Sequence, residues 1–280
     1  MISEKAFLAC MLELLAPKPG NVNRYHDFKN KTIIDFLYGS ISVVRLVRDV
    51  FLGMPPGDAL IESVQTMLRL ARGNTHLGIL IMFFPISMAA KEIFFWNRSD
   101  LAKRASEVLK EIPPEETVKI AKAVKYVSPP LPMIGDRDMD VTTDEVLRNI
   151  LEKKITAYEW FKAGSSVNIV AKELVDGYKL TLEVSRIIEN KKEDLGLSKA
   201  IVDASIYVMS RVIDSHMAAE KGESLAKSAM EWARAIVVSG YDDDEIKKFD
   251  SWLREHQANP GSTADIVTTA LFLLLLEGVL

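Results

Sequence analysis

The chain has 280 residues, of which 48% are hydrophobic and 26% charged, and a formal net charge of −4 at pH 7. This composition is typical of a folded globular protein and excludes a disordered chain. Acidic and basic residues are mixed along the whole length, so the sequence lacks the basic block expected of a nucleic-acid-binding protein. A single cysteine, Cys10, excludes an internal disulfide and a cysteine-rich zinc site, which suits a reducing compartment.

The apolar runs are too short for membrane spans. The two longest, 79–90 and 266–276, fall below the roughly 20 residues that a spanning helix needs. The N-terminal residues include Glu4 and Lys5 among apolar neighbours and show no small-residue cleavage site. The sequence therefore predicts a cytoplasmic protein that does not bind a membrane.

Apolar residues recur at helical spacing along the chain, and no run alternates as a strand would. We therefore expect an all-α fold, a single globular multi-helix domain with buried central helices. The proline-rich stretch near 127–141 is a candidate internal boundary or active-site loop. The expected helices span residues 3–15, 31–51, 58–71, 79–90, 99–111, 115–126, 145–153, 158–161, 167–189, 199–216, 223–238, 243–256 and 262–276.

The first expected helix contains a carboxylate in apolar surroundings. Every residue from Ala6 to Leu15 is apolar except Glu13. A helix that is apolar on all sides is typically buried, so we expect the Glu13 carboxylate to be buried too. It then needs a cation, a donor or a proton, because an unpaired buried charge is costly. Two interpretations stay open, a catalytic carboxylate and a structural ion pair with Lys18.

A rigid polar turn, Pro17-Lys18-Pro19-Gly20-Asn21, follows this helix, and its prolines fix the backbone. The next polar stretch offers three groups that can bind a phosphate or a metal, Arg24, His26 and Asp27. Rigid turns after a buried helix are suited to holding a binding group, although a plain surface loop has the same composition.

Two expected helices begin with polar residues although their bodies are apolar. Asn74 is expected to cap the helix behind Gly73-Asn74-Thr75-His76-Leu77-Gly78, and Ser262-x-x-Asp265 is a candidate capping box for the last helix. The N-terminus of a helix offers free N–H groups and a partial positive charge, which suits a phosphate. Capping alone would also explain both patterns.

Two further polar motifs are less specific. Alternating aspartates at 136–140 resemble the start of a calcium loop, but Val141 and Leu147 stand where glycine and glutamate are required. Magnesium bound to a nucleotide through Asp138 or Asp140 remains open, as does a solvated acidic loop. Asp214-Ser215-His216 is expected to end the helix 199–216, where a histidine is favoured by the helix dipole.

Three separated motifs together resemble the triphosphoribosyl-dephospho-CoA synthase family. They are Pro-Lys-Pro-Gly-Asn-Val at 17–22, Gly-Asn-Thr-His-Leu-Gly at 73–78 and Asn-Pro-Gly-Ser-Thr-Ala-Asp at 259–265, in the family's order and near its spacing. Asp214-Ser215 stands where the family has an Asp-Thr pair. The resemblance implies an all-helical enzyme that joins the 2′-hydroxyl of 3′-dephospho-CoA to C1′ of the ATP ribose and releases adenine, with Mg²⁺ on the triphosphate.

The resemblance also suggests roles for individual residues. Displacement at an anomeric carbon passes through a cationic sugar. A nearby carboxylate can stabilise this cation, or it can deprotonate the hydroxyl group that attacks it. The predicted catalytic residues are Glu13, Asp27, Asp265 and His76, the last assisting the leaving adenine or binding phosphate. The predicted nucleotide- and phosphate-binding residues are Lys18, Gly20, Asn21, Arg24, His26, Asn74, Thr75, Gly78, Asn259, Gly261, Ser262 and Thr263. The predicted magnesium ligands are Asp138, Asp140 and Asp27.

The chain also departs from the family pattern. Asn21 and Asn23 stand where the family has Leu and Asp, and the segment 217–221 lacks the family's basic tail. Three readings therefore stay open: the synthase or a relative that uses another alcohol acceptor, an inactive nucleotide-binding protein, and a helical scaffold. The expected partners are ATP and dephospho-CoA or another alcohol, with a homodimer as a further candidate assembly.

Overall fold

The computed structural model describes residues 1–28, 30–71, 73–127, 139–143 and 145–280, and within these ranges every regular element is an α-helix. The all-α prediction is confirmed, while the single-domain prediction remains a prediction. The candidate boundary near 127–141 falls mainly on residues outside the described ranges. The helices are α1 Ile2–Leu15, α2 Ile33–Phe51, α3 Pro56–Leu70, α4 Leu77–Glu92, α5 Arg98–Val108, α6 Pro114–Val127, α7 Val146–Glu152, α8 Ala157–Gly164, α9 Ile169–Val175, α10 Lys179–Leu195, α11 Leu197–Arg211, α12 Ser215–Lys221, α13 Glu223–Val238, α14 Asp243–Glu255 and α15 Gly261–Glu277.

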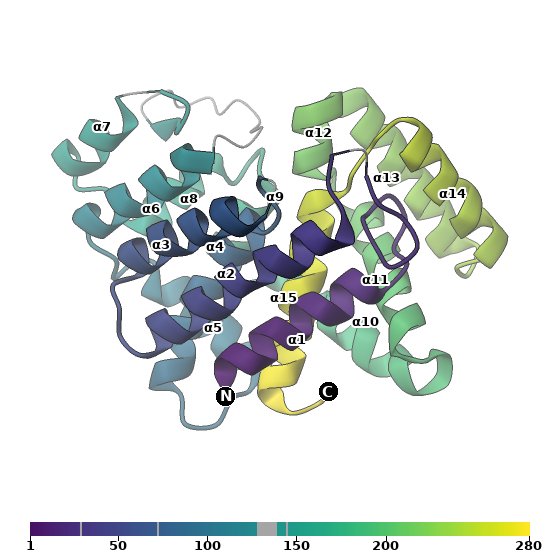
Figure 1. Cartoon of the computed structure of the whole chain (residues 1–280), viewed down its shortest axis with the longest axis horizontal. Helices are drawn as coiled ribbons and strands as arrows, with labels where there is room; N and C mark the ends of the chain where they lie inside the picture. The colour runs from purple at the N-terminus through teal and green to yellow at the C-terminus, as the bar shows by residue number, and fades with distance from the viewer. Residues whose placement is uncertain (29, 72, 128–138, 144) are drawn as a thin grey trace.

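Two apolar helices, α4 and α15, form the middle of the molecule. Figure 1 shows α15, in yellow, running through the centre, with α2 to α9 on one side and α10 to α14 on the other. Residues 266–276 of α15 and 79–87 of α4 are buried, and the rings of Phe83 and Phe272 stack with their centroids 4.2 Å apart. Among the described helices, none is long and apolar enough to cross a membrane.

The buried apolar side chains form two clusters that share α11. The larger cluster takes Ile201 and Ala204 from α11 and extends over α1 to α10 and α15. The smaller cluster takes Val202 and Ile206 from the same helix and extends over α12 to α14. Opposite faces of α11 therefore pack into different clusters, which explains why this helix is apolar around most of its circumference.

Two long helices expected from the sequence are each broken in the structure. The expected helix 167–189 becomes α9 and α10, because Gly177 and Tyr178 adopt the left-handed conformation, with φ of +74° and +57°. The expected helix 199–216 ends at Arg211, and Asp214 caps the separate helix α12 by accepting a hydrogen bond from the Met217 N–H. The prediction that Asp214-Ser215-His216 ends a helix is therefore wrong, since these residues begin one.

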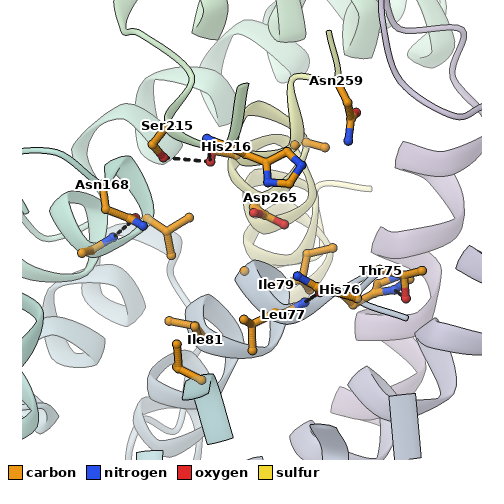
Figure 2. Close-up of a pocket in the computed structure, with 18 of the residues that line it drawn as sticks. Thr75, His76, Leu77, Ile79, Ile81, Asn168, Ser215, His216, Asn259 and Asp265 are labelled. Atoms are coloured by element: carbon orange, nitrogen blue, oxygen red, sulfur yellow. Dashed lines mark hydrogen bonds between the residues drawn. The ribbon is translucent and has the colours of Figure 1, made fainter. Parts of the chain in front are cut away.

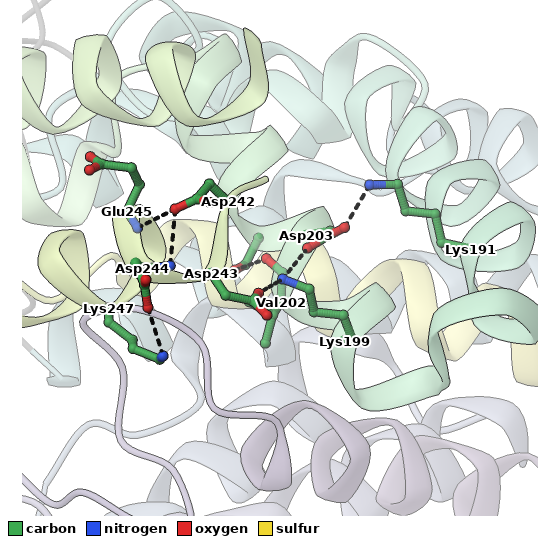
Figure 3. Close-up of polar contacts among 10 residues, drawn as sticks. Lys191, Lys199, Val202, Asp203, Asp242, Asp243, Asp244, Glu245 and Lys247 are labelled. Carbon is green, nitrogen blue, oxygen red and sulfur yellow. Dashed lines mark hydrogen bonds and ion pairs between the residues drawn. The ribbon is translucent and has the colours of Figure 1, made fainter. Parts of the chain in front are cut away.

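Buried Asp203 links the smaller cluster to α10 (Figure 3). Its side chain on α11 is 1% exposed and lies 2.6 Å from Lys191 Nζ on α10 and 3.3 Å from Lys199 Nζ. Lys199 also pairs with Asp243 at the start of α14, at 2.6 Å. One buried carboxylate thus balances two half-buried ammonium groups and connects three helices.

We expect Asp203→Asn to lower the free energy of unfolding by about 2–3 kcal/mol, because it leaves two ammonium groups without their buried partner. Urea unfolding followed by circular dichroism measures this loss. The matched control is Asp244→Asn, since Asp244 pairs with Lys247 while 80% exposed. The control should change stability by less than about 0.5 kcal/mol. Equal effects of the two substitutions would contradict the structural role of Asp203.

Candidate functional site

A cavity of about 200 Å³ lies where the N-terminal ends of α4 and α15 approach each other (Figure 2). Residues of α1, α2, α6, α8, α9 and α12, together with residues 21, 22, 31 and 139–141, complete its wall. The sequence motifs at 73–78 and 259–265 therefore meet in one place. The side chains of the wall that matter below belong to Glu13, Asn21, Lys31, Phe36, Asn74, Thr75, His76, Gly78, Asp140, Trp160, Phe161, Asn168, Ser215, His216, Asn259, Gly261, Ser262 and Asp265.

The predicted N-cap at Asn74 is wrong, since the N-cap of α4 is His76 and its side chain makes no capping hydrogen bond. The Asn74 side-chain oxygen accepts a hydrogen bond from the Leu77 N–H at 3.1 Å. Thr75 and His76 fit against α2 only because position 39 there is glycine. A Cβ on Gly39 would lie 2.1 Å from Thr75 Oγ1. The loop before α4 is therefore held at a fixed place on the cavity wall.

His76 is a buried, neutral imidazole. Its Nδ1 lies 2.8 Å from Thr75 Oγ1, and its ring centroid is 5.6 Å from that of Phe36. Burial, assisted by the charge of Lys31, lowers the pKa of His76 from 6.5 to about 3. At neutral pH the side chain can therefore donate or accept a hydrogen bond but carries no positive charge.

The start of α15 is bound to α12 through Asp214. The Asp214 carboxylate accepts hydrogen bonds from the backbone N–H and the hydroxyl of Thr263, at 2.7 and 2.8 Å. Ser262 Oγ lies 2.9 Å from Ser215 Oγ, and it accepts a hydrogen bond from the His216 N–H. The predicted capping box of Ser262 is wrong, since the N-cap of α15 is Pro260 and no side chain caps it. Ser262 instead joins two helix ends.

Asp265 projects from the second turn of α15 toward the start of α4 (Figure 2). A Cβ on Gly78 would lie 2.0 Å from Asp265 Oδ2, so only glycine at position 78 allows this approach. Burial, together with the nearby carboxylates of Asp214 and Glu13, raises the pKa of Asp265 well above its usual range. The Ile79 backbone N–H and Lys31 oppose this rise only in part. The Asp265 carboxyl group therefore holds its proton more strongly than an exposed aspartate does.

Glu13 lines the cavity and also forms the ion pair that one interpretation expected. Lys18 Nζ lies 2.8 Å from Glu13 Oε1 and donates a hydrogen bond to the Glu13 carbonyl oxygen at 2.8 Å. The Lys18 side chain is 0% exposed, whereas 10% of the Glu13 side chain is accessible. Lys18 thus balances the charge of Glu13 from behind the cavity wall.

The comparisons with known proteins agree with this geometry. All of residues 1–280 match the family model described as ATP:dephospho-CoA triphosphoribosyl transferase. The chain belongs to this family. The predicted membership is confirmed, and so is the prediction of a transferase for which ATP is a substrate.

A solved structure gives a separate comparison for the fold of this transferase. A chain from Archaeoglobus fulgidus that carries the name triphosphoribosyl-dephospho-CoA synthase superposes with a TM-score of 0.71 at 23% identity. The match covers 86% of this chain and 99% of that chain. The likeness shows that the two share a fold. None of the curated proteins compared with the chain matches it.

Some residues predicted to bind in the transferase do not line the cavity. Arg24, His26 and Asp27 are exposed, and Asp27 accepts a hydrogen bond from the Ile33 N–H at the start of α2. Lys18, Gly20 and Thr263 support neighbouring segments from behind the wall. Gly20, for example, has φ of +73° and donates its N–H to Asp250. Asp138 lies outside the described residues. The predicted residues that do line the cavity are Glu13, Asn21, Asn74, Thr75, His76, Gly78, Asp140, Asn259, Gly261, Ser262 and Asp265.

The structure also adds lining residues that were not among the predicted site residues. Lys31 is the one lysine or arginine among the described lining residues, although the sequence predicted it only as the start of the helix 31–51. Ser215 and His216 reach the cavity because α12 begins there. Trp160 and Phe161 contribute aromatic rings 4.9 Å apart, and no motif in the sequence distinguished them.

The acidic side chains around the cavity determine whether it could hold the predicted magnesium ion. Within the described ranges, no group of three or more His, Cys, Asp or Glu side chains is arranged to hold a metal. Magnesium held by a triphosphate needs only one or two protein carboxylates. Glu13, Asp140 and Asp265 line the cavity and fit that smaller requirement, whereas Asp27 does not reach it.

The lowered pKa of His76 predicts a specific dependence of stability on pH. Between pH 6.5 and about pH 3 the unfolded chain binds a proton that the folded imidazole rejects, so His76 destabilises the fold as pH falls below 6.5. We expect the stability of the wild type, relative to His76→Gln, to fall by about 2–3 kcal/mol between pH 7 and about pH 4.5. Urea unfolding of both proteins at each pH tests this. A constant difference would show that His76 titrates normally.

Proposed function

We propose that the enzyme transfers the 5-triphosphoribosyl group of ATP to the 2′-hydroxyl of 3′-dephospho-CoA and releases adenine. The observation that carries the proposal is the meeting of two helix N-termini at one cavity with the carboxyl group of Asp265 between them. Helix N-termini favour phosphate groups, and a carboxyl group favours a sugar that becomes cationic. The cavity thus offers complementary surroundings for both parts of triphosphoribose.

The triphosphate is proposed to bind at the starts of α4 and α15. The positive ends of two helix dipoles point there, the Asn74 side chain lies just before α4, and the Ser262 side chain lies in the first turn of α15. Lys31 supplies a positive side chain in place of Lys18 and Arg24. Burial lowers the pKa of Lys31, and the charges of Glu220, Asp265 and Asp35 oppose this change. A bound triphosphate would hold this ammonium group charged.

The reaction breaks the bond between C1′ of the ribose and N9 of adenine and forms a bond from C1′ to the acceptor oxygen. We propose that Asp265 accepts the proton of the attacking hydroxyl, because burial and the neighbouring acids raise its pKa and make its carboxylate a stronger base. Glu13 lines the same cavity, and its charge is proposed to stabilise the cationic ribose. The leaving adenine takes up a proton in turn.

His76 is proposed to act as a neutral hydrogen-bonding group that orients ATP. Its lowered pKa makes an imidazolium acid unavailable at pH 7, so it would assist the leaving adenine by hydrogen bonding alone. The Phe36, Trp160 and Phe161 rings offer apolar surface for a planar base in the same cavity. Trp160 is oriented by the hydrogen bond that its Nε1 donates to the Met139 carbonyl at 3.2 Å.

Magnesium is proposed to accompany the triphosphate. Asp265, Glu13 and Asp140 are the cavity carboxylates that would hold it, one or two of them at a time. The ion would offset the negative charge of the phosphates next to these carboxylates.

The decisive assay measures adenine release from ATP and magnesium, with and without 3′-dephospho-CoA, by chromatography. The proposal expects release only when dephospho-CoA is present, with a product whose mass contains both substrates less adenine. Release that requires another alcohol would reassign the acceptor. ATP that raises the melting temperature without any release would support a nucleotide-binding protein instead.

Asp265→Asn should lower kcat at least roughly 100-fold, because removal of a proton-transfer group typically costs this much. The melting temperature with and without ATP shows whether the variant folds and still binds nucleotide. Asp244→Asn is the matched control, since Asp244 is an exposed aspartate on α14. An Asp265→Asn variant that folds and keeps its kcat would overturn the proposed role.

Lys31→Met should raise KM for ATP about 10-fold, because a charged hydrogen bond to a phosphate is lost. Arg24→Met is the comparison, since the Arg24 guanidinium lies over the Tyr25 ring outside the cavity. Steady-state kinetics at varied ATP concentration separate the two. If Arg24→Met raises KM and Lys31→Met does not, the triphosphate binds at the exposed turn.

A further inference from the structure

The outer faces of α1 and α2 expose an unusual amount of apolar surface. The two helices pack against each other and lie side by side in Figure 1. At least one-third of each of seven large side chains on them is exposed. We call these residues the α1/α2 surface: Phe7 (39%), Leu8 (44%), Leu15 (46%), Ile34 (50%), Leu37 (36%), Tyr38 (50%) and Ile41 (45%).

The spacing of these residues marks two regular stripes. On α1 the partly buried Met11 and Leu12 fill the interval between Leu8 and Leu15, and on α2 the exposed positions 34, 37, 38 and 41 follow a helical repeat. No charged residue interrupts either stripe. Between residues 6 and 15 the one charged side chain is Glu13, and between 33 and 44 it is Asp35, and both are buried.

The single chain leaves α1 in a state that its sequence does not favour. A helix that is apolar on all sides is expected to be buried on all sides. In the structure the inner face of α1 is covered, with Ala6, Ala9 and Cys10 buried, while Phe7, Leu8 and Leu15 are not. The expectation of complete burial is therefore wrong for the isolated chain. A covering partner would remove the discrepancy.

The size of the α1/α2 surface fits a dimer interface. A large apolar side chain presents roughly 150–200 Å², so the seven exposed fractions leave on the order of 500–600 Å² of apolar surface. A standard interface buries about 800 Å² per partner, of which about 65% is apolar in homodimers. These two figures give about 520 Å² of apolar surface per partner, which agrees with the exposed area.

We infer that the α1/α2 surface is the contact between two copies of this chain. An uncharged apolar surface is complementary to itself, and a two-fold axis would pair α1 and α2 of one protomer with the same helices of the other. A lipid surface is the other apolar partner to consider. Membrane-binding helices carry free Lys and Arg along their polar face. Here Lys5, the single basic residue of α1, donates a hydrogen bond to the Leu275 carbonyl, and the two arginines of α2, Arg45 and Arg48, pair with Glu62 and Asp49.

The inferred contact lies directly behind the cavity. The inner faces of the same helices supply Glu13 and Cys10 from α1 and Phe36 from α2 to the cavity wall. Covering the outer faces would hold these two helices together at the place where they form the site. The inference itself does not depend on the reaction, because it rests on exposed surface alone.

Sedimentation equilibrium of the whole protein tests the inference. At roughly 10 μM we expect twice the chain mass of 31.3 kDa. Leu8→Asp places a charge in the middle of the surface and should raise the dissociation constant at least about 100-fold. Circular dichroism and the melting temperature establish that the variant is folded. Tyr38→Asp on α2 is a second variant with the same expected result, should Leu8→Asp fail to fold.

Val238→Asp is the matched control, because Val238 is a large apolar residue that is 89% exposed at the end of α13, outside the α1/α2 surface. It should leave the dimer unchanged. A wild-type protein that remains a monomer would overturn the inference. Equal weakening by Leu8→Asp and Val238→Asp would place the contact elsewhere. Flotation of the wild type with phosphatidylcholine–phosphatidylglycerol vesicles, lost in Leu8→Asp, would instead identify a lipid surface as the partner.

Discussion

The site depends on the close approach of two helix N-termini inside the protein. The partially positive ends of α4 and α15 come together here, and a hydrogen-bond acceptor group between them is favourable. Asp265 supplies that group, and Gly78 supplies the space for it. Asp214 then fixes the start of α15 through its two hydrogen bonds with Thr263. The same positive ends that hold these carboxylates would attract a triphosphate, so fold and binding share one electrostatic arrangement.

The carboxyl groups of Glu13 and Asp265 differ in their electrostatic surroundings. Lys18 balances Glu13 from behind the wall, whereas Asp265 faces two other acids and has a raised pKa. This difference supports the proposed roles, with charge stabilisation by Glu13 and proton transfer by Asp265. Neutral His76 adds a directed hydrogen-bonding group without adding charge. The apolar body of each helix protects this arrangement from water.

Much of this architecture could be predicted from the sequence, since helical periodicity and the polar starts of apolar helices are local signals. The polar start of α4 and the Glu13–Lys18 pair are examples. The break between α11 and α12 could not be predicted, because residues 211–213 contain neither glycine nor proline and tertiary contacts of Asp214 stabilise the new start. The sequence also could not show that Lys31 lines the cavity and Arg24 does not, because this depends on how the chain before α2 packs against the rest of the protein.

The sharing of α11 between two apolar clusters has a consequence for how the protein loses activity. His216 and Asn259 adjoin Met217 and Ala258, which belong to the smaller cluster, while Glu13 and His76 lie in helices of the larger one. The site is thus formed by residues of both apolar clusters, which differ in size. Clusters of unequal size open at unequal free energies, and the smaller unit can unfold while the larger remains intact. Heating would then abolish turnover while most of the helical circular dichroism signal persists. Activity would therefore report this partial unfolding at a lower temperature than circular dichroism does.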